Sequence, residues 1–582
     1  MKTLRRQWVV CAVWIGLLAL SANPLSGQAI KTASEAGGFK AYTSFEQMWE
    51  FLQEVQAHST EMLLSDYGIS VEGRRAPYAV LSRPLVTQPW EALASGKPIV
   101  LLAANVHGGE RTVRESLLML TRDLADSNHS VNKLLDKLVI IVAPSINPDG
   151  FARSSRGDAL GIDMNRDYIK LEQPSLASFV QNVWLAWQPH VALDGHNGGS
   201  FPYNICYQGP AHAGSDQRLT EICDQEIFPF VDKQMEASGY KSWYYSGGNR
   251  TAWQAGLTDV RVNNNYGGFI NSISILYESP NQPPDVGAKS GYVASLALLE
   301  YVAQNADKVM MYVDRARRET IEMGQKAQGD IPVQVTKGPK PYKVSYLIAE
   351  GTGADRKIVQ VTGADLIAEP VVTKTRPRPY AYVLEARAFK AVALLRKHNI
   401  TIEVLQKDTE LPVEAYQMTK LERRPQYDHP ASVTVTCADE TVKQTRTFPK
   451  GSFVIRTGQA QGRLVTQLLE PETDDNVLTW NTMDALLTAG GRGGEAGAES
   501  GAPGRGMPQG TDQTGGRGAG NRGGNQTGAT GADPTRAQQQ NQNQQRPRQP
   551  AQGQQAPQTR PSVIPIFKLM APTGLATQIM KN

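Results

Sequence analysis

The sequence predicts an α/β fold followed by a smaller β-rich domain. From about residue 77 to 300, apolar strand-like runs alternate with helical patterns, which is the signature of an α/β domain. From about 340 to 487, short β runs follow one another with turn residues between them. The chain has 582 residues, 40% of them hydrophobic, which is enough for two or three domains with cores of their own.

Residues 1–27 have the pattern of a secretory signal peptide. Lys2, Arg5 and Arg6 precede an apolar stretch over 8–20, and small residues follow it. The stretch is short for a membrane anchor, and no cysteine stands at the cleavage region to carry a lipid. We therefore expect a secreted or periplasmic protein with no stable membrane span after cleavage.

Composition limits the classes of partner and cross-link. The 60 basic and 56 acidic residues give a formal charge of +4, so global electrostatics favour neither nucleic acid nor a membrane surface as partner. Cleavage of the signal leaves Cys206, Cys223 and Cys437, and an odd number leaves at least one thiol unpaired within the chain. Cys206 and Cys223 either form a disulfide or fill the core as small apolar residues.

The elements of the first region have local signals. Thr43-Ser44-Phe45-Glu46 begins a helix with a capping box, and apolar residues continue at helical spacing to Val55. The same spacing marks a helix over 113–124. The expected strands are 78–82, 99–106, 138–143, 190–193, 203–208 and 272–277.

The second region is expected to form a β-rich domain over 340–487. Its expected strands are 344–349, 357–361, 381–384, 400–405, 432–437 and 452–455. Residues 489–561 consist mainly of Gly, Gln, Asn, Ala, Pro, Arg and Thr, which bury too little apolar surface to fold. Because the strand-like run 563–569 follows, we interpret 489–561 as a disordered insertion, a solvated linker rather than an RNA-binding tract. The β-rich domain then continues at 562–576.

Polar, Gly-rich corners follow four of the expected strands, where α/β domains build their sites. The corners are His107-Gly108-Gly109-Glu110, Asn147-Pro148-Asp149-Gly150, Asp194-Gly195-His196-Asn197-Gly198-Gly199 and Glu278-Ser279-Pro280. The second corner leads on to Arg153, Arg156 and the pair Asn165-Arg166. Singly, each corner is also explained as a turn, a cap or a surface charge.

His107 and Glu110 can bring a nitrogen and a carboxylate to one metal ion. Catalytic zinc is typically held by three protein ligands, with the fourth position left to water. The spacing alone is weak evidence, because His58 and Glu61 share it. We expect His58 to be a surface residue at the end of a helix. Because His107 and Glu110 supply only two ligands, the third ligand of a zinc site has to come from another corner.

The order of the four corners resembles that of the zinc carboxypeptidase family. The segment Tyr67-Gly68-Ile69-Ser70-Val71-Glu72-Gly73-Arg74 is similar to the one that opens the family's first strands. The resemblance covers roughly residues 40–305. It implies a mixed-sheet α/β/α catalytic domain over 40–320, and the β-rich domain looks like the accessory domain of some exported bacterial members.

The resemblance implies a role for particular residues. His107, Glu110 and His196 would hold one Zn²⁺, a ligand set of two imidazoles and a carboxylate that suits the metal. Glu278 would be the general base that takes a proton from the water activated by zinc. Arg156 would stabilise the oxyanion, with Arg153 as the second choice. Asp194 either orients a ligand or forms a turn.

The resemblance also implies a substrate: the C-termini of peptides or proteins. Asn165 and Arg166 would bind the terminal carboxylate, which a guanidinium can hold bidentately. A tyrosine on a loop before the base would join them, and Tyr245 and Tyr266 are the candidates, with Tyr244 beside them.

Two other functions remain open at this stage. A zinc amidohydrolase of the same fold would act on cell-wall peptides or N-acyl amino acids. A non-catalytic binding protein would keep the fold without the chemistry, although the full set of site residues argues against it. Asp259, Arg261 and Arg250 could each select the charge of the substrate side chain.

Overall fold

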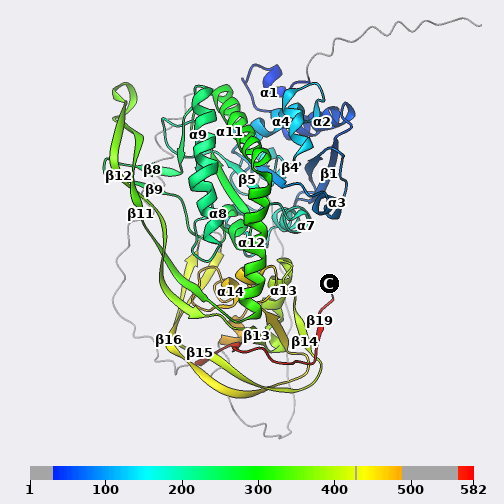
Figure 1. Ribbon diagram of the computed structural model, residues 1–582, viewed down its shortest axis with the longest axis vertical. Helices are drawn as coiled ribbons and strands as arrows, with labels where there is room; N and C mark the ends of the chain where they lie inside the picture. Colours follow the sequence, from blue (N-terminus) through cyan, green and yellow to red (C-terminus); the bar gives the residue numbers. More distant parts are fainter. Residues whose placement is uncertain (1–29, 427–428, 488–561, 582) are drawn as a thin grey trace, which may run out of the picture. The chain divides into compact units, whose positions relative to one another are not determined.

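The computed structural model describes residues 30–426, 429–487 and 562–581. Within these residues the strands form three sheets of eight, four and seven strands (Figure 1). The expected signal peptide and the whole of the expected insertion lie outside the described residues.

The eight-stranded sheet confirms the α/β fold. It has the order β1-β2-β4-β3-β5-β10-β6-β7 and is mixed: β4, β3, β5 and β10 are parallel to one another in its middle, and β2 and β6 pair with them antiparallel. The strands are β1 (Met62–Ile69), β2 (Arg75–Leu81), β3 (Ile99–Ala104), β4 (Val139–Ala143), β5 (Val191–His196), β6 (Ile205–Gln208), β7 (Ser242–Tyr244) and β10 (Ile273–Glu278). Strands β3, β4, β5 and β10 are buried along their whole length, which is why they are nearly continuous apolar runs.

Helices cover both faces of this sheet, and each face has its own apolar core. One core contains side chains of α2, α4, α9, α11 and α12, and the other contains those of α3, α6, α7 and α10. The helices up to residue 325 are α1 (Ala33–Ala36), α2 (Phe45–Ala57), α3 (Pro89–Ala94), α4 (Thr112–Ala125), α5 (Pro148–Arg153), α6 (Pro174–Phe179), α7 (Leu185–Trp187), α8 (Gln217–Ile222), α9 (Phe228–Ala237), α10 (Asn263–Phe269), α11 (Pro284–Gln304) and α12 (Ala306–Gln325). The predicted capping box at the start of α2 is present, formed by Ser44 and Gln47 rather than by Thr43 and Glu46.

The seven-stranded sheet is antiparallel and forms the β-rich C-terminal region. Its order is β16-β15-β18-β13-β17-β14-β19. Its strands are β13 (Ala381–Leu384), β14 (Glu403–Leu405), β15 (Thr409–Gln426), β16 (His429–Phe448), β17 (Phe453–Arg456), β18 (Ser562–Leu569) and β19 (Thr577–Ile579). Helices α13 (Phe389–Lys397), α14 (Gly462–Leu469) and α15 (Asp484–Leu487) accompany them. Strand β18 lies between β13 and β15, although it follows them by more than a hundred residues of sequence.

The four-stranded sheet joins residues from both halves of the chain. Its order is β11-β12-β9-β8, with β8 (Ser246–Gly248), β9 (Ala252–Ala255), β11 (Asp330–Glu350) and β12 (Lys357–Pro377). The expected strands 344–349 and 357–361 are the end of this long hairpin, and residue 340 lies inside β11. Much of the hairpin is exposed on both faces, so its sequence carries little alternation to reveal its length.

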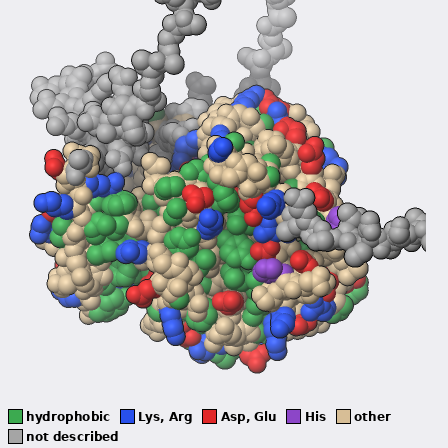
Figure 2. All heavy atoms as spheres, turned by 90° about the horizontal axis from the view of Figure 1, so that it is seen from above, with side chains coloured by type: hydrophobic (Ala, Val, Ile, Leu, Met, Phe, Trp, Pro, Cys, Tyr) green, Lys and Arg blue, Asp and Glu red, His purple; other side chains and the backbone are tan. Residues whose placement is uncertain are grey.

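The remaining expectations concern cysteines, membrane and charge. Cys206, Cys223 and Cys437 are free and buried, so the first two fill the core and form no disulfide. No helix in the described part of the chain has both the length and the apolarity needed to cross a membrane. On the face seen in Figure 2, acidic and basic side chains are intermixed with apolar ones.

Candidate metal and catalytic site

Three of the predicted corners meet because their strands are neighbours in the sheet. Strand β3 lies beside β5, and β5 lies beside β10, all in parallel. In that register His196 is directly opposite Glu278. The carboxyl ends of adjacent parallel strands share one edge, so the side chains that follow them converge there.

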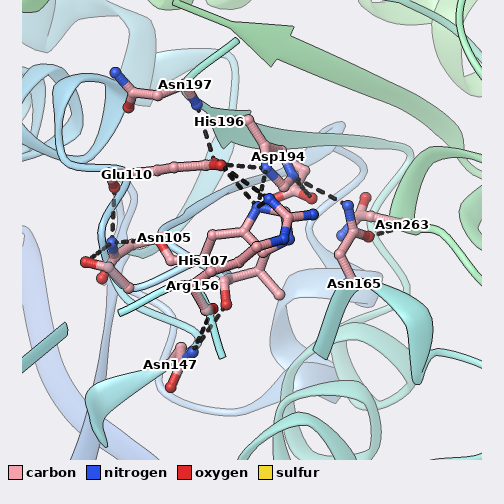
Figure 3. A network of polar contacts seen from close by, with 12 residues as sticks. Asn105, His107, Glu110, Asn147, Arg156, Asn165, Asp194, His196, Asn197 and Asn263 are labelled. Atoms are coloured by element: carbon pink, nitrogen blue, oxygen red, sulfur yellow. Dashed lines mark hydrogen bonds and ion pairs between the residues drawn. The ribbon is translucent and has the colours of Figure 1, made fainter. Parts of the chain in front are cut away.

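His107, Glu110 and His196 form a possible metal site (Figure 3). Nδ1 of His107 lies 3.1 Å from Nδ1 of His196, and the two oxygens of Glu110 lie 2.9 and 2.8 Å from these nitrogens. Four ligand atoms placed tetrahedrally around zinc at its usual bond length are separated by about 3.3 Å. The three side chains are therefore already gathered closely enough to hold one ion.

The outer nitrogens of both imidazoles meet carboxylates. Nε2 of His107 is 2.9 Å from Asp163, and Nε2 of His196 is 2.8 Å from Asp194. Such a carboxylate fixes the imidazole ring and its tautomer so that the other nitrogen faces a metal. Asp194 was one of two alternatives in the sequence, and the structure places it behind the ligand. Asp163 was missed, although a carboxylate two residues before the Asn165-Arg166 pair was visible as a signal.

The site concentrates negative charge in a buried place. Asp163, Asp194 and Glu278 are buried beside the two imidazoles, and Glu110 is partly buried. Burial opposes the charged form of His196, but the carboxylates of Asp194 and Glu110 raise its pKa well above its ordinary value. A divalent cation suits this donor set because it would neutralise the surplus of carboxylates.

Two asparagine side chains, Asn105 and Asn147, hold the His107–Glu110 turn by hydrogen bonds to its backbone and to the residue before it. The buried side chain of Asn105 donates from Nδ2 to the carbonyls of His107, Gly108 and Glu110 at 2.7–3.1 Å. Asn147 donates to the carbonyl of Val106 at 3.0 Å. The second corner packs against the first so closely that a Cβ on Gly108 would lie 1.9 Å from the backbone of Gly150.

Glu278 is the buried carboxylate at the end of β10, with 7% of its surface exposed. Burial raises its pKa to about 7; the carboxylate of Glu110 adds to the shift, and His196 opposes it. A Cβ on Gly198 would lie 2.5 Å from Oε2 of Glu278, so a glycine is needed where this backbone passes the carboxylate. Gly198 was not singled out from the sequence.

The structure brings Arg156 to the cluster and leaves Arg153 outside it. Nη1 of Arg156 is 3.2 Å from Nδ1 of His107, and Nη2 donates to Asp163 at 2.8 Å. The side chain remains 49% exposed, so it lies at the open side of the site. Arg153 is paired with Glu72 instead.

Asn165 and Arg166 lie beside the possible metal site. Nδ2 of Asn165 is 3.4 Å from Nε2 of His196, and its Oδ1 accepts from the backbone N–H of Asn263 at 3.1 Å. The guanidinium of Arg166 donates to the carbonyl of Asn165 at 2.9 Å and is partly exposed. The next residue, Asp167, is buried beside Lys170 and outside the cluster.

Of the three tyrosines, the structure brings Tyr245 to the site. The negative charge of Glu278, together with burial and the charge of Glu110, raises the pKa of the Tyr245 hydroxyl. The expectation for Tyr266 does not fit, because its ring is fully buried and its hydroxyl bonds His398. The hydroxyl of Tyr244 donates to Asp224, on the far side of the loop.

The three charged residues considered for side-chain selection are engaged elsewhere. Arg261 contacts Asp259 at 2.6 Å and Asp475 at 3.2 Å. Arg250 pairs with Glu350 of β11. Within the described residues, these groups hold the C-terminal region to the α/β half of the molecule.

Comparison with known proteins gives the same family from independent evidence. Residues 48–183 match the family model described as zinc carboxypeptidase. The chain is 26% identical to Carboxypeptidase 2 of Trichophyton rubrum over 463 residues, covering 75% of this chain and 84% of the fungal protein. It is also 26% identical to Carboxypeptidase D of Drosophila melanogaster over 251 residues, covering 38% of this chain and 17% of the fly protein.

Solved structures of carboxypeptidases are also similar to it. The metallo-carboxypeptidase from Burkholderia cenocepacia is 20% identical and superposes with a TM-score of 0.38, over 45% of this chain and 70% of that one. The sequence matches and the ordered corners agree on one conclusion. Residues 48–183 carry the zinc carboxypeptidase pattern, and the chain is similar over three quarters of its length to a carboxypeptidase; both findings support a zinc metallocarboxypeptidase, a hydrolase of peptide bonds.

Proposed function

We propose that this protein is an exported carboxypeptidase that removes C-terminal residues from peptides, with one zinc ion held by His107, Glu110 and His196. The observation that carries the proposal is the convergence of two Nδ1 atoms and a carboxylate within 3.1 Å of one another. The buried carboxylate of Glu278 lies at the end of the neighbouring strand.

Glu278 is the general base in this proposal. Zinc, when bound, supplies Lewis acidity that polarises the scissile carbonyl and makes water more acidic. Glu278 takes the proton of the attacking water and passes it to the amine that leaves. A carboxylate with a pKa near 7 is suited to both transfers, because it gains and loses a proton readily near neutral pH.

The remaining residues position the substrate and its developing charge. Arg156, half-exposed beside His107, donates to the oxyanion, a contribution that can reach about 3 kcal/mol. Arg166 binds the terminal carboxylate through its guanidinium, supported by Asn165. Tyr245, whose pKa is raised by the charge of Glu278, contacts the bound C-terminal residue in this proposal.

A release assay tests the proposal. Protein lacking residues 1–27 should free C-terminal amino acids from a peptide library and should lose this activity on treatment with a chelator. Glu278→Gln should lower kcat/KM by about 10³-fold while bound zinc is retained. Glu61→Gln, the same change at a carboxylate away from the proposed site, should leave kcat/KM unchanged. Equal activity of Glu278→Gln and wild type would refute the role of Glu278.

The substrate class and the organisation of the chain need separate measurements. Incubation with free peptides, cell-wall fragments and N-acyl amino acids, followed by mass spectrometry of the products, distinguishes a peptidase from an amidohydrolase of other acyl groups. We also propose that 40–320 is the catalytic domain and that 340–487, continued at 562–576, is an accessory domain. Localisation of tagged protein in the producing cell tests export.

A further inference from the structure

The long hairpin β11–β12 reaches the loop that carries Tyr245. Residues Asp365, Leu366 and Ile367 of β12 pair in parallel with Ala252, Trp253 and Gln254 of β9. Strand β9 pairs in turn with β8, which begins directly after Tyr245. Figure 1 shows the hairpin extending from the β-rich region to lie beside β8 and β9.

Lys337 of β11 fixes the end of this loop. Its ammonium donates to the carbonyl of Ala255, the last residue of β9, and to the carbonyl of Gly256, the residue that follows. The N–H of Gly256 donates to the carbonyl of Tyr245 at 2.7 Å. The peptide unit between Ala255 and Gly256 therefore takes part in both bonds: its carbonyl accepts from Lys337, and its N–H donates to Tyr245.

Gly256 also contacts the ring of Tyr245 directly. A Cβ added to Gly256 would lie 3.1 Å from Cδ1 of Tyr245 and 1.5 Å from Oε1 of Gln208. On its other side, the N–H of Tyr245 donates to the carbonyl of Tyr207 in β6 at 2.9 Å. Tyr245 is therefore held between the eight-stranded sheet and the segment to which Lys337 is bound.

The same hairpin holds the loop that follows His196. The N–H of Leu347 donates to the hydroxyl of Tyr203 at 2.7 Å, and Arg356 stacks on Phe201 at 3.9 Å. The hydroxyl of Ser200 donates to the carbonyl of Ser246, which ties the two loops to each other. The hairpin thus contacts both loops that border Tyr245 and Glu278.

We propose that Lys337 is a positioning residue, and that through it the β11–β12 hairpin holds Tyr245 in its substrate-binding position before substrate arrives. This inference rests on the proposed role of Tyr245. Preorganisation raises affinity because the free-energy cost of ordering the loop does not have to be met when the substrate binds. Without Lys337 only a fraction of the molecules would have the loop in the binding-competent position. The apparent Kd for substrate would then equal the intrinsic Kd divided by that fraction.

Kinetics of Lys337→Met, with Lys343→Met as control, test the inference. Lys343 lies on the same strand and pairs with Asp365 at the surface, 60% exposed. We expect KM of Lys337→Met to rise about tenfold with kcat within twofold, because the bound complex still contains the ordered loop. Lys337→Arg, which keeps a cation and several donors, should recover most of the loss. An unchanged KM for Lys337→Met would overturn the proposal.

A second variant shows whether Lys337 acts through Tyr245. In a Tyr245→Phe background, the effect of Lys337→Met on KM should shrink to less than about threefold. The same tenfold effect in both backgrounds would show that Lys337 acts by another route and would overturn the proposal.

Hydrogen exchange separates failure of this inference from failure of the proposed function. In the intact protein, amides of 245–256 should exchange about tenfold faster in Lys337→Met than in Lys343→Met. If wild type showed no carboxypeptidase activity, faster exchange would still support the positioning of the loop. Equal exchange in the two variants would overturn it whatever the activity.

Discussion

The chain contains His-x-x-Glu twice, in different local structures. His107 and Glu110 follow a buried parallel strand, and their side chains face His196 from the next strand. His58 ends helix α2, where its Nδ1 lies 2.8 Å from the carbonyl of Glu54. Glu61 turns the other way and pairs with Arg83 and Asn132.

The difference shows that strand-end position, rather than spacing, decides whether a His-x-x-Glu pair meets further polar groups and could hold a metal. After a parallel strand, the neighbouring strands bring more polar groups to the same edge. After a surface helix, no such convergence occurs, and the same residue types satisfy local hydrogen bonds and ion pairs. The following substitutions test this contrast, beginning with the largest expected effect.

Removal of the histidine from each of the two His-x-x-Glu pairs gives the sharpest contrast. His107→Ala should lose bound zinc and reduce kcat/KM by at least about 10³-fold, since a Lewis-acid metal supplies several kcal/mol to catalysis. His58→Ala should retain both metal and activity. Zinc content by mass spectrometry and kcat/KM measured on the same preparations decide the matter; metal retained in His107→Ala would contradict the assignment.

The carboxylate behind His107 is the second test. Asp163→Asn should weaken zinc binding about 10- to 100-fold, because the imidazole loses the partner that fixes its orientation. Competition with a chelator measures this affinity directly. Asp136→Asn serves as control, because Asp136 is a surface partner of Arg83, which also pairs with Glu61. This variant should bind zinc as wild type does.

Gly198 tests the space beside Glu278. Gly198→Ala should lower kcat/KM about tenfold with zinc retained, because its Cβ would displace a carboxylate oxygen that lies 2.5 Å away. Gly574→Ala, whose Cβ would meet nothing within 4 Å, is the matched control. Equal activity of the two variants would mean that the carboxylate adjusts without cost.

The smallest effect concerns Glu61, which should matter for stability and not for catalysis. The hydrogen bond from Arg83 lowers the pKa of Glu61 below its ordinary value of 4.5. Burial raises this pKa, and the hydrogen bond from Asn132 lowers it further. The carboxylate is therefore stabilising above its unfolded pKa, and this contribution is lost as pH falls through the lowered folded value. Glu61→Gln should cost about 1 kcal/mol at pH 7 and less at about pH 3 in urea unfolding. A cost that grows toward acid would contradict this sign.

Much of the catalytic half could be predicted because its signals are local. The buried strands β3, β4, β5 and β10 are short apolar runs, and each ends in a polar corner. The α/β fold and the resemblance to the zinc carboxypeptidase family are confirmed. The roles of His107, Glu110, His196 and Glu278 stay predictions, which the geometry supports.

What the sequence did not reveal depends on pairing between distant residues. Arg153 and Arg156 could not be separated because Ser154, with a φ of 55°, turns the chain after α5 and sends the two guanidiniums apart. Tyr245 could not be chosen because its loop is held by β12, more than a hundred residues later. Such parallel pairing leaves no periodic mark in either strand.

Strand β18 lies inside the seven-stranded sheet, yet along the chain it follows every other strand of that sheet except β19. A nascent chain that stops before residue 562 already contains every proposed zinc ligand and Glu278. It lacks the strand that joins β13 to β15, so two inner edges with unpaired backbone groups would face water or other chains. Premature termination or proteolysis near this point should therefore produce aggregation-prone protein rather than a smaller active enzyme.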